Sequence, residues 1–287
     1  MAESGFVFPT RMSLPGLIRF LVFRFLLNLK SAYSYRVSFW SQIFFMAANN
    51  GFLLWFWHLF FQRFGAEFSA RGGWGSQDLY SLYAVTAVAF GLAHLFAGSA
   101  VDLAALVADG ELDYFLSHPV PTLFHALVIR TRVSAIGDVI FGMGLLTALF
   151  HGNLADLLVA LAVCIPGALV YVAVAILGAA AAFWIGESRG ITGQLVHLLT
   201  TFGTYPEAVF QGSVRWVIYG VVPAAFFSHL PVAYLRFFSE GKGFTPESLR
   251  VLGLLLAGAA FLLFLAVGLF QRGLRRYESG GGLALRS

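Results

Sequence analysis

Six long apolar segments run through this chain, and they constrain its fold more than any other feature. A transmembrane helix needs ~20 apolar residues, because each residue advances ~1.5 Å across ~30 Å of hydrocarbon. The fifth apolar segment is short and needs residues beyond Pro206 to cross. We expect six transmembrane helices, at residues 37–61, 79–100, 123–150, 154–185, 191–204 and 249–270.

The composition agrees with an all-α polytopic membrane protein. Of the 287 residues, 59% are hydrophobic and only 11% are charged, against roughly 25% charged residues in a soluble domain. So few charges cannot cover a water-soluble surface, which excludes a soluble enzyme, a disordered chain and a coiled coil. We expect a single transmembrane domain over residues 1–287.

Basic residues predict how the chain lies in the membrane. Residues 11–35 are apolar but carry four basic side chains, which predicts an N-terminal interfacial helix rather than a cleavable signal peptide. With six crossings, twelve of the 18 Lys and Arg residues fall on the side of the two termini. This excess predicts that both termini are cytoplasmic. The partner of these bases is expected to be membrane lipid and not nucleic acid.

The connection over residues 205–246 is too long for a tight turn and too apolar for a solvated loop. It contains Pro206, Pro223, Pro231 and Pro246. Short apolar helices broken by proline are tolerated at membrane depth only where protein or a cavity covers the backbone. We expect two short re-entrant helices on the outer side before the last span. A seventh crossing would place the C-terminal arginines outside, against the charge rule.

Motifs for catalysis and metal binding are nearly absent from the sequence. There is no phosphate-binding GxxxxGK[ST] loop and no HExxH motif, so we assign no catalytic, metal or cofactor residue to this chain. A GxSxG pattern occurs at residues 186–190, where a tight turn between spans explains it better than an intramembrane serine hydrolase. The lone Cys164 lies in an apolar run and reads as a packed helix residue.

Residues 110–121, GELDYFLSHPVP, carry the most specific signal. A glycine, early acidic residues and two final prolines predict a short amphipathic helix in the cytosol. It would act as a docking element for a soluble partner, where a few aromatic anchors supply most of the binding energy. The alternative is an interfacial linker. The residues expected at the docking site are Gly110, Glu111, Leu112, Asp113, Tyr114, Phe115, Leu116 and Pro119.

Five polar residues inside the predicted spans are candidates for a substrate path or for interhelix contacts. Asp138 would line a path or contact another helix, or else pair with Arg130 or Arg132 near the cytoplasmic side. The two histidines would be neutral hydrogen-bonded core residues rather than proton relays, and the two asparagines would serve helix packing. The other four candidates are Asn49, Asn50, His94 and His197.

The order of these features resembles the permease subunit of type-2 ABC exporters. The resemblance rests on the basic interfacial helix, six spans, the GxLDxxLxxP pattern from Gly110 to Pro119, the proline-broken outer segment and the tail LRRYESGGG. It implies a dimer of identical or paralogous permease chains with two separate ATPase subunits. It also implies that ATP and Mg²⁺ bind in the ATPase and that this chain has no enzymatic activity of its own. The location would be the plasma membrane, in a bacterium.

Two rival classes of function remain open at this point. An ion-coupled secondary transporter would use Asp138 and a histidine as a relay, but usually shows internal repeats and more buried acids. A non-transport membrane protein, such as an intramembrane hydrolase, would need no ATPase. The three classes differ in which subunits copurify with the chain.

Overall fold

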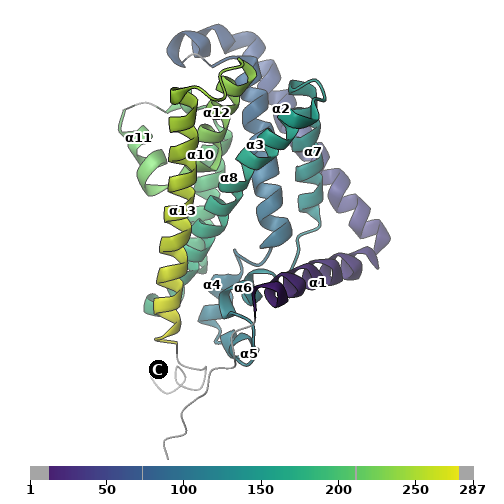
Figure 1. Cartoon of the computed structure of the whole chain (residues 1–287), viewed down its shortest axis with the longest axis vertical. Coiled ribbons are helices and arrows are strands. Elements are labelled where there is room, and N and C mark those ends of the chain that lie inside the picture. The colour runs from purple at the N-terminus through teal and green to yellow at the C-terminus, as the bar shows by residue number, and fades with distance from the viewer. Residues whose placement is uncertain (1–12, 73, 211, 278–287) are drawn as a thin grey trace, which may run out of the picture.

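The computed structural model describes residues 13–72, 74–210 and 212–277, and these residues form helices with no strand among them (Figure 1). The long helices are α1 (Leu14–Tyr33), α2 (Arg36–Gly72), α3 (Ser76–Phe96), α7 (Ser134–Leu149), α8 (Leu154–Ala180), α10 (Arg189–Thr204) and α13 (Pro246–Leu274). The short helices are α4 (Leu103–Ala108), α5 (Leu112–Leu116), α6 (Thr122–Leu127), α9 (Ala182–Ile185), α11 (Ser213–Trp216) and α12 (Leu230–Ser239).

Four helical segments in the described part of the chain are long and apolar enough to cross a membrane. They are Arg36–Ala66, Ser76–Phe96, Leu154–Ile185 and Pro246–Leu274. These segments correspond to four of the six predicted spans. The helices at the other two, α7 and α10, have 16 residues each, so each is about 24 Å long at 1.5 Å per residue.

The predicted span at 123–150 is wrong as a single helix. The structure divides it into α6 and α7, with residues 128–133 between them in a non-helical connection. Arg130, Thr131 and Arg132 interrupt the apolar pattern within this connection, which gives the break a local signal in the sequence. The carbonyls of Val128 and Ile129 accept hydrogen bonds from side chains of α1, and these contacts come from residues about 100 positions away, so the sequence does not reveal them.

Local sequence signals explain where the long helices begin. The Asn153 side chain caps α8 by accepting a hydrogen bond from the Ala155 amide at 3.0 Å. At the start of α13, Pro246 stands in the first turn and the Thr245 hydroxyl accepts a hydrogen bond from the Ser248 amide. An acidic residue follows in the first turn of each helix, where its negative charge interacts favourably with the helix dipole and stabilises the helix.

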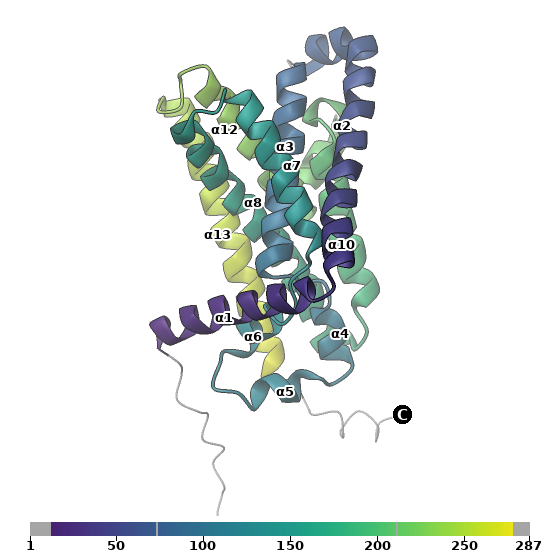
Figure 2. The ribbon, with the colours of Figure 1, turned by 90° about the vertical axis from the view of Figure 1, so that its right-hand side faces the viewer.

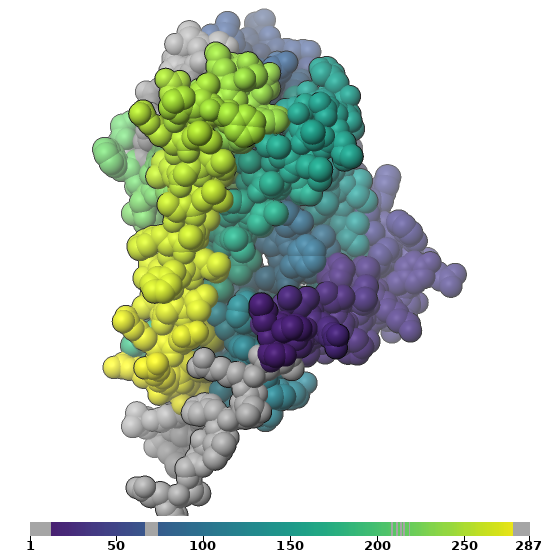
Figure 3. Space-filling model, viewed as in Figure 1, coloured from purple at the N-terminus to yellow at the C-terminus, as the bar shows by residue number. Residues whose placement is uncertain are grey.

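The core lies along α3 and α8, and α2 and α13 lie outside it. In the most apolar window of each helix, 67% of the residues of α3 and 61% of those of α8 are buried, against 11% for α2 and 17% for α13. Figure 3 shows α13 along the length of one side of the molecule, with its outer side chains uncovered. A chain with two uncovered apolar helices needs lipid or another apolar protein around them.

The turns between helices gather at two opposite ends of the molecule. One end carries α1, α4, α5, α6 and the C-terminal end of α13, and the other carries the α7–α8 and α12–α13 connections (Figure 2). A hollow of about 980 Å³ lies at this second end between Asp78, His151 and Arg236. This division into two ends matches the grouping of turns that the sequence predicts.

The connection after α10 contains a 3-10 turn at Glu207–Val209 and then two longer helical stretches, one on either side of Pro223. The first combines α11 with a π-helical turn at Val217–Val221, and the second combines a π-helical turn at Ala225–His229 with α12. The second stretch is buried against the core, with Phe227 fully covered. The prediction of two short helices in 205–246 therefore agrees with the backbone, although their relation to the bilayer stays a prediction.

Candidate functional site

The segment that the sequence predicts as a docking element forms α5, at the end of the molecule beside α1. Gly110 has φ +76°, a conformation that glycine adopts without steric cost, and it separates α4 from α5. Leu112 and Phe115 are buried, whereas Tyr114 is 55% exposed. The expectation that Phe115 is an exposed anchor is wrong, because Phe115 turns with Leu112 toward the core.

The outer side of α5 is polar and aromatic. Glu111, Asp113 and Pro119 are exposed and Leu116 is half-buried. A hollow of about 510 Å³ lies next to this side, and its lining includes Asp102, Glu111, Tyr114 and Arg130. The hollow therefore lies beside a tyrosine that is 55% exposed, with acidic and basic side chains in its lining.

Two chain segments lie side by side where the docking segment leaves the helix bundle, and we call them the neck, residues 97–102 and 127–132. The Ser99 amide donates to the Leu127 carbonyl at 3.3 Å, and the Arg130 amide donates to the Ser99 hydroxyl at 3.1 Å. The Arg132 amide donates to the His94 carbonyl at 3.2 Å. The neck thus joins the end of α3 to the start of α7.

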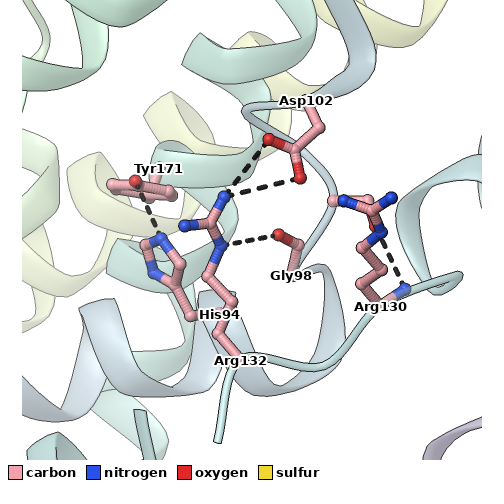
Figure 4. A network of polar contacts seen from close by, with 7 residues as sticks. His94, Gly98, Asp102, Arg130, Arg132 and Tyr171 are labelled. Atoms are coloured by element: carbon pink, nitrogen blue, oxygen red, sulfur yellow. Dashed lines mark hydrogen bonds and ion pairs between the residues drawn. The ribbon is translucent and has the colours of Figure 1, made fainter. Parts of the chain in front are cut away.

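Side chains strengthen the neck, as Figure 4 shows. The Arg132 guanidinium donates to the Gly98 carbonyl at 3.0 Å and forms an ion pair with Asp102 at 3.3 Å. Beside it, the buried His94 lies 3.3 Å from the Tyr171 hydroxyl of α8 and 3.0 Å from the Phe90 carbonyl. His94 is therefore a hydrogen-bonded core residue in this structure.

The N-terminal helix α1 contacts the neck from the side. Asn28 donates to the Val128 carbonyl at 3.1 Å and to the Thr131 hydroxyl at 3.3 Å, and Arg24 reaches the Ile129 carbonyl at 3.5 Å. These side chains satisfy backbone groups that the break between α6 and α7 leaves without helical partners. The sequence places Arg24 and Asn28 on one face of α1, but it does not reveal their target.

Aromatic rings pack around His125 of α6 and join α1, α5 and α6. The ring of Phe20 lies 5.1 Å from that of His125, and the ring of Phe115 lies 5.0 Å away, both edge to face. His118 lies 5.1 Å away on the other side. Burial, helped by the nearby His118 and Arg24, lowers the pKa of His125 to about 4, so the ring is neutral at pH 7.

Two contacts reach the α4–α5 turn from distant parts of the chain. Asp109 forms an ion pair with Arg189, the first residue of α10. The Tyr277 hydroxyl, just after α13, donates to the Gly110 carbonyl at 2.6 Å. Burial and the nearby Asp113 carboxylate raise the pKa of Tyr277, so the phenol keeps its proton at neutral pH. Neither contact was predicted from the sequence.

The structure places the other polar candidates in different environments. Asp138 accepts a hydrogen bond from Asn50 of α2 at 2.6 Å, whereas Asn49 and His197 are exposed. The structure does not show the alternative pairing of Asp138 with Arg130 or Arg132, because Asp138 contacts Asn50 and Arg132 pairs with Asp102. Asp138 therefore makes an interhelix contact and is not brought together with the histidines.

Two structural observations concern the prediction that this chain has no catalytic residue and no metal site. Ser188 of the GxSxG pattern is buried at the start of α10, while His197 is exposed farther along the same helix. Within residues 13–72, 74–210 and 212–277, no group of three or more His, Cys, Asp or Glu side chains is placed to hold a metal ion. That this chain binds no cofactor stays a prediction.

Comparison with known proteins identifies the family. The family model described as ABC-2 family transporter protein matches residues 47–281, which is most of the chain. No curated protein matches, and no solved structure matches. Proteins of this family are membrane permeases that work with an ABC ATPase subunit and are not themselves the ATPase. Neither an ion-coupled secondary transporter nor an intramembrane hydrolase fits this assignment, and the chain belongs to the ABC-2 transporter family as a membrane permease subunit.

Proposed function

We propose that this permease exports its substrate and docks its ATPase through the exposed side of α5. Two ATPase subunits would bind ATP and Mg²⁺, and closure of the ATPases would push on residues 110–119. A second permease chain, identical or paralogous, would complete the substrate path. The location would be a bacterial plasma membrane, with α5 and both termini in the cytoplasm, in agreement with the excess of basic residues on that side.

One observation carries the docking proposal, namely the division of α5 into a buried and an exposed side. Leu112 and Phe115 fasten the helix to the core, so it is held in place without a partner. Tyr114, which is 55% exposed, and the exposed Asp113 then face solvent beside the hollow of about 510 Å³. An aromatic anchor next to a hollow, with acidic residues around it, suits a partner surface that carries basic residues.

The exposed side of α5 can be tested with a double substitution. Tyr114→Ala combined with Asp113→Lys removes the anchor and reverses one charge, and we expect a loss of ~2–4 kcal/mol of binding free energy. This loss weakens binding by roughly one to three decades, at about 1.4 kcal/mol per decade. The measurement is the amount of ATPase that co-elutes with the purified permease.

A matched pair at the opposite end of the molecule provides the control. Phe244→Ala combined with Glu247→Lys removes one exposed aromatic residue, 81% exposed, and reverses one exposed acid. It should leave co-elution unchanged, as should Asp138→Asn inside α7. Full co-elution with the α5 variant would mean that α5 is only a linker. Purified without its ATPase, the permease is expected to hydrolyse no ATP, because it lacks a phosphate-binding loop.

The same proposal includes six crossings, with α7 and α10 as short ones. Each of these helices extends from the α5 end of the bundle toward the opposite end, since α10 starts beside Asp109 and α7 ends beside the hollow of about 980 Å³. A helix shorter than the hydrocarbon thickness is accommodated by local thinning of the bilayer or by neighbouring helices. The two helical stretches around Pro223 would re-enter the outer leaflet without crossing it.

The uncovered side of α2 supports contact with lipid and with a second permease chain. Its large exposed residues include Trp40, Phe44, Phe45, Phe52 and Trp55, each 59–69% exposed. Such an aromatic surface is unfavourable in water and suits either hydrocarbon or another apolar helix. The family resemblance supports the proposed export direction.

A further inference from the structure

The turn between α4 and α5 is held by residues that belong to neither helix. Asp109 pairs with Arg189, and both side chains are partly exposed, at 46% and 47%. Arg189 is fixed at the start of α10, where its amide donates to the Glu187 carboxylate at 2.8 Å and its side chain pairs with the same residue at 3.3 Å. The ion pair therefore ties the α4–α5 turn to the first residue of α10.

The next residue of the turn is held from a third element. The Gly110 carbonyl accepts a hydrogen bond from Tyr277 at 2.6 Å, three residues after α13 ends at Leu274. The ring of Tyr277 packs edge to face on Phe183 at 6.3 Å, and Phe183 packs on Phe270 of α13 at 5.2 Å. Tyr277 is thus placed by α13 and by the connection that contains α9.

Adjacent residues of one turn are therefore joined to α10 and to α13. The neck at residues 97–102 and 127–132 joins the same segment to α3 and α7, so α5 has two separate connections to the bundle. Helices α10 and α13 are also the two elements on either side of the connection at 205–245. A push on α5 through Asp109 and Gly110 would move the helices that carry that connection.

We propose that Arg189 and Tyr277 are positioning residues that transmit movement of α5 to α10 and α13. The inference rests on the proposed docking of an ATPase at α5 and adds the route by which docking moves the permease. Exposed ion pairs contribute little to stability, so removing these contacts should leave the fold intact. The two contacts act on neighbouring residues, and the test removes both together.

The experiment uses the complex of permease and ATPase, with Cys164→Ser as the parent. Spin labels are attached at Ala148→Cys on α7 and Glu247→Cys on α13, both exposed positions toward the end opposite α5. The distance distribution between the labels is measured by pulsed electron paramagnetic resonance, without nucleotide and with ATP and vanadate. In the parent, nucleotide trapping should shift the distribution. In Arg189→Ala combined with Tyr277→Phe, the shift should be lost while the ATPase still co-elutes.

Three further variants distinguish the loss of the Arg189 and Tyr277 contacts from a general loss of structure. In the Tyr277→Phe background, Arg189→Asp places an acid beside Asp109 and should abolish the shift, and adding Asp109→Arg should restore it in part. Arg272→Ala, an exposed arginine in the last turn of α13, should behave like the parent. A full shift of the distance distribution in Arg189→Ala combined with Tyr277→Phe, with the ATPase still bound, would overturn the inference. Failure of the parent chain to retain any ATPase would instead overturn the proposed function.

Discussion

Gly98 lies where two chain segments come closest, and a side chain there has no room. A methyl group at this position would come within 2.5 Å of the Arg130 carbonyl oxygen and 2.7 Å of the His94 carbonyl oxygen. Backbone atoms cannot move aside without breaking the hydrogen bonds of the neck. We expect Gly98→Ala to lower the free energy of unfolding by ~1–3 kcal/mol, the usual cost of overpacking.

Thermal unfolding followed by size-exclusion chromatography in detergent checks this prediction. Gly144→Ala in α7 is the matched control, because a methyl group at Gly144 meets no atom within 4 Å. That substitution should leave the midpoint unchanged or raise it slightly, since alanine loses less backbone entropy in a helix. Equal midpoints for the two variants would show that the neck tolerates separation of its two segments.

His125 gives the α5 end of the molecule a dependence on pH. Its pKa is about 4 in the folded protein and 6.5 in an exposed histidine, so the unfolded chain binds more protons between these values. The free energy of unfolding should therefore fall as the pH is lowered from about 6.5 toward 4. A His125→Phe variant keeps an aromatic ring and should lose this part of the pH dependence, which unfolding midpoints at pH 7 and pH 5 would measure.

For single residues, the sequence predicts whether a side chain is apolar or polar better than it predicts which residues that side chain contacts. It places Leu112 and Phe115 on one apolar side of α5, but whether that side meets the core or a partner depends on helices far away in the sequence. The contact of Asp138 could not be predicted for the same reason, because its partner Asn50 lies 88 positions away on α2. Gly110 is different, since a helix break needs only local chemistry.

Among the elements, α1 illustrates how one helix can support another that is not continuous with it. Replacing Arg24 and Asn28 together with alanine leaves the carbonyls of Val128 and Ile129 without their side-chain donors. Each unsatisfied buried group costs about 1–3 kcal/mol. We expect a lower unfolding midpoint and weaker ATPase co-elution, because the neck positions α5.

Arg19→Ala provides the comparison within α1. Arg19 is exposed, so its loss changes the charge of the helix surface without removing a contact to the neck. The unfolding midpoint of Arg19→Ala, measured by the same assay, should match that of the parent chain. A similar decrease in both variants would indicate that membrane contact of α1, rather than its bond to the neck, stabilises the protein.

The long helices were predictable because apolar length is a local property. The spans at 79–100, 154–185 and 249–270 correspond to α3, to α8 with α9, and to α13. The polar run from Arg130 to Arg132 marks the split of 123–150 in the sequence, whereas the contacts of this connection with α1 and Ser99 were not predictable, since those partners lie far away along the chain. In the α2 region, the helix continues past the predicted end at residue 61 to Gly72.

For the molecule as a whole, the two ends should lie on opposite sides of the membrane. Asp113 on α5 and Lys242 after α12 are both exposed. Helices α5 and α12 lie at opposite ends of the molecule (Figure 1). On a Cys164→Ser background, a cysteine at position 242 should react with an impermeant maleimide in intact cells, and a cysteine at position 113 only after the cells are opened. Labelling of position 113 from outside would reverse the assigned orientation.

The neck has a consequence for how such permeases diversify. Its hydrogen bonds close the base of the loop formed by residues 103–126, so that loop is a module whose ends stay fixed whatever lies between them. Exchanging its exposed residues between paralogous permeases, with residues 97–102 and 127–132, the buried Leu112 and Phe115 and the contacts of Asp109 and Gly110 retained, would change the choice of ATPase without disturbing the spans. Partner specificity could then evolve independently of substrate specificity, because the two are carried by separately replaceable parts of one chain.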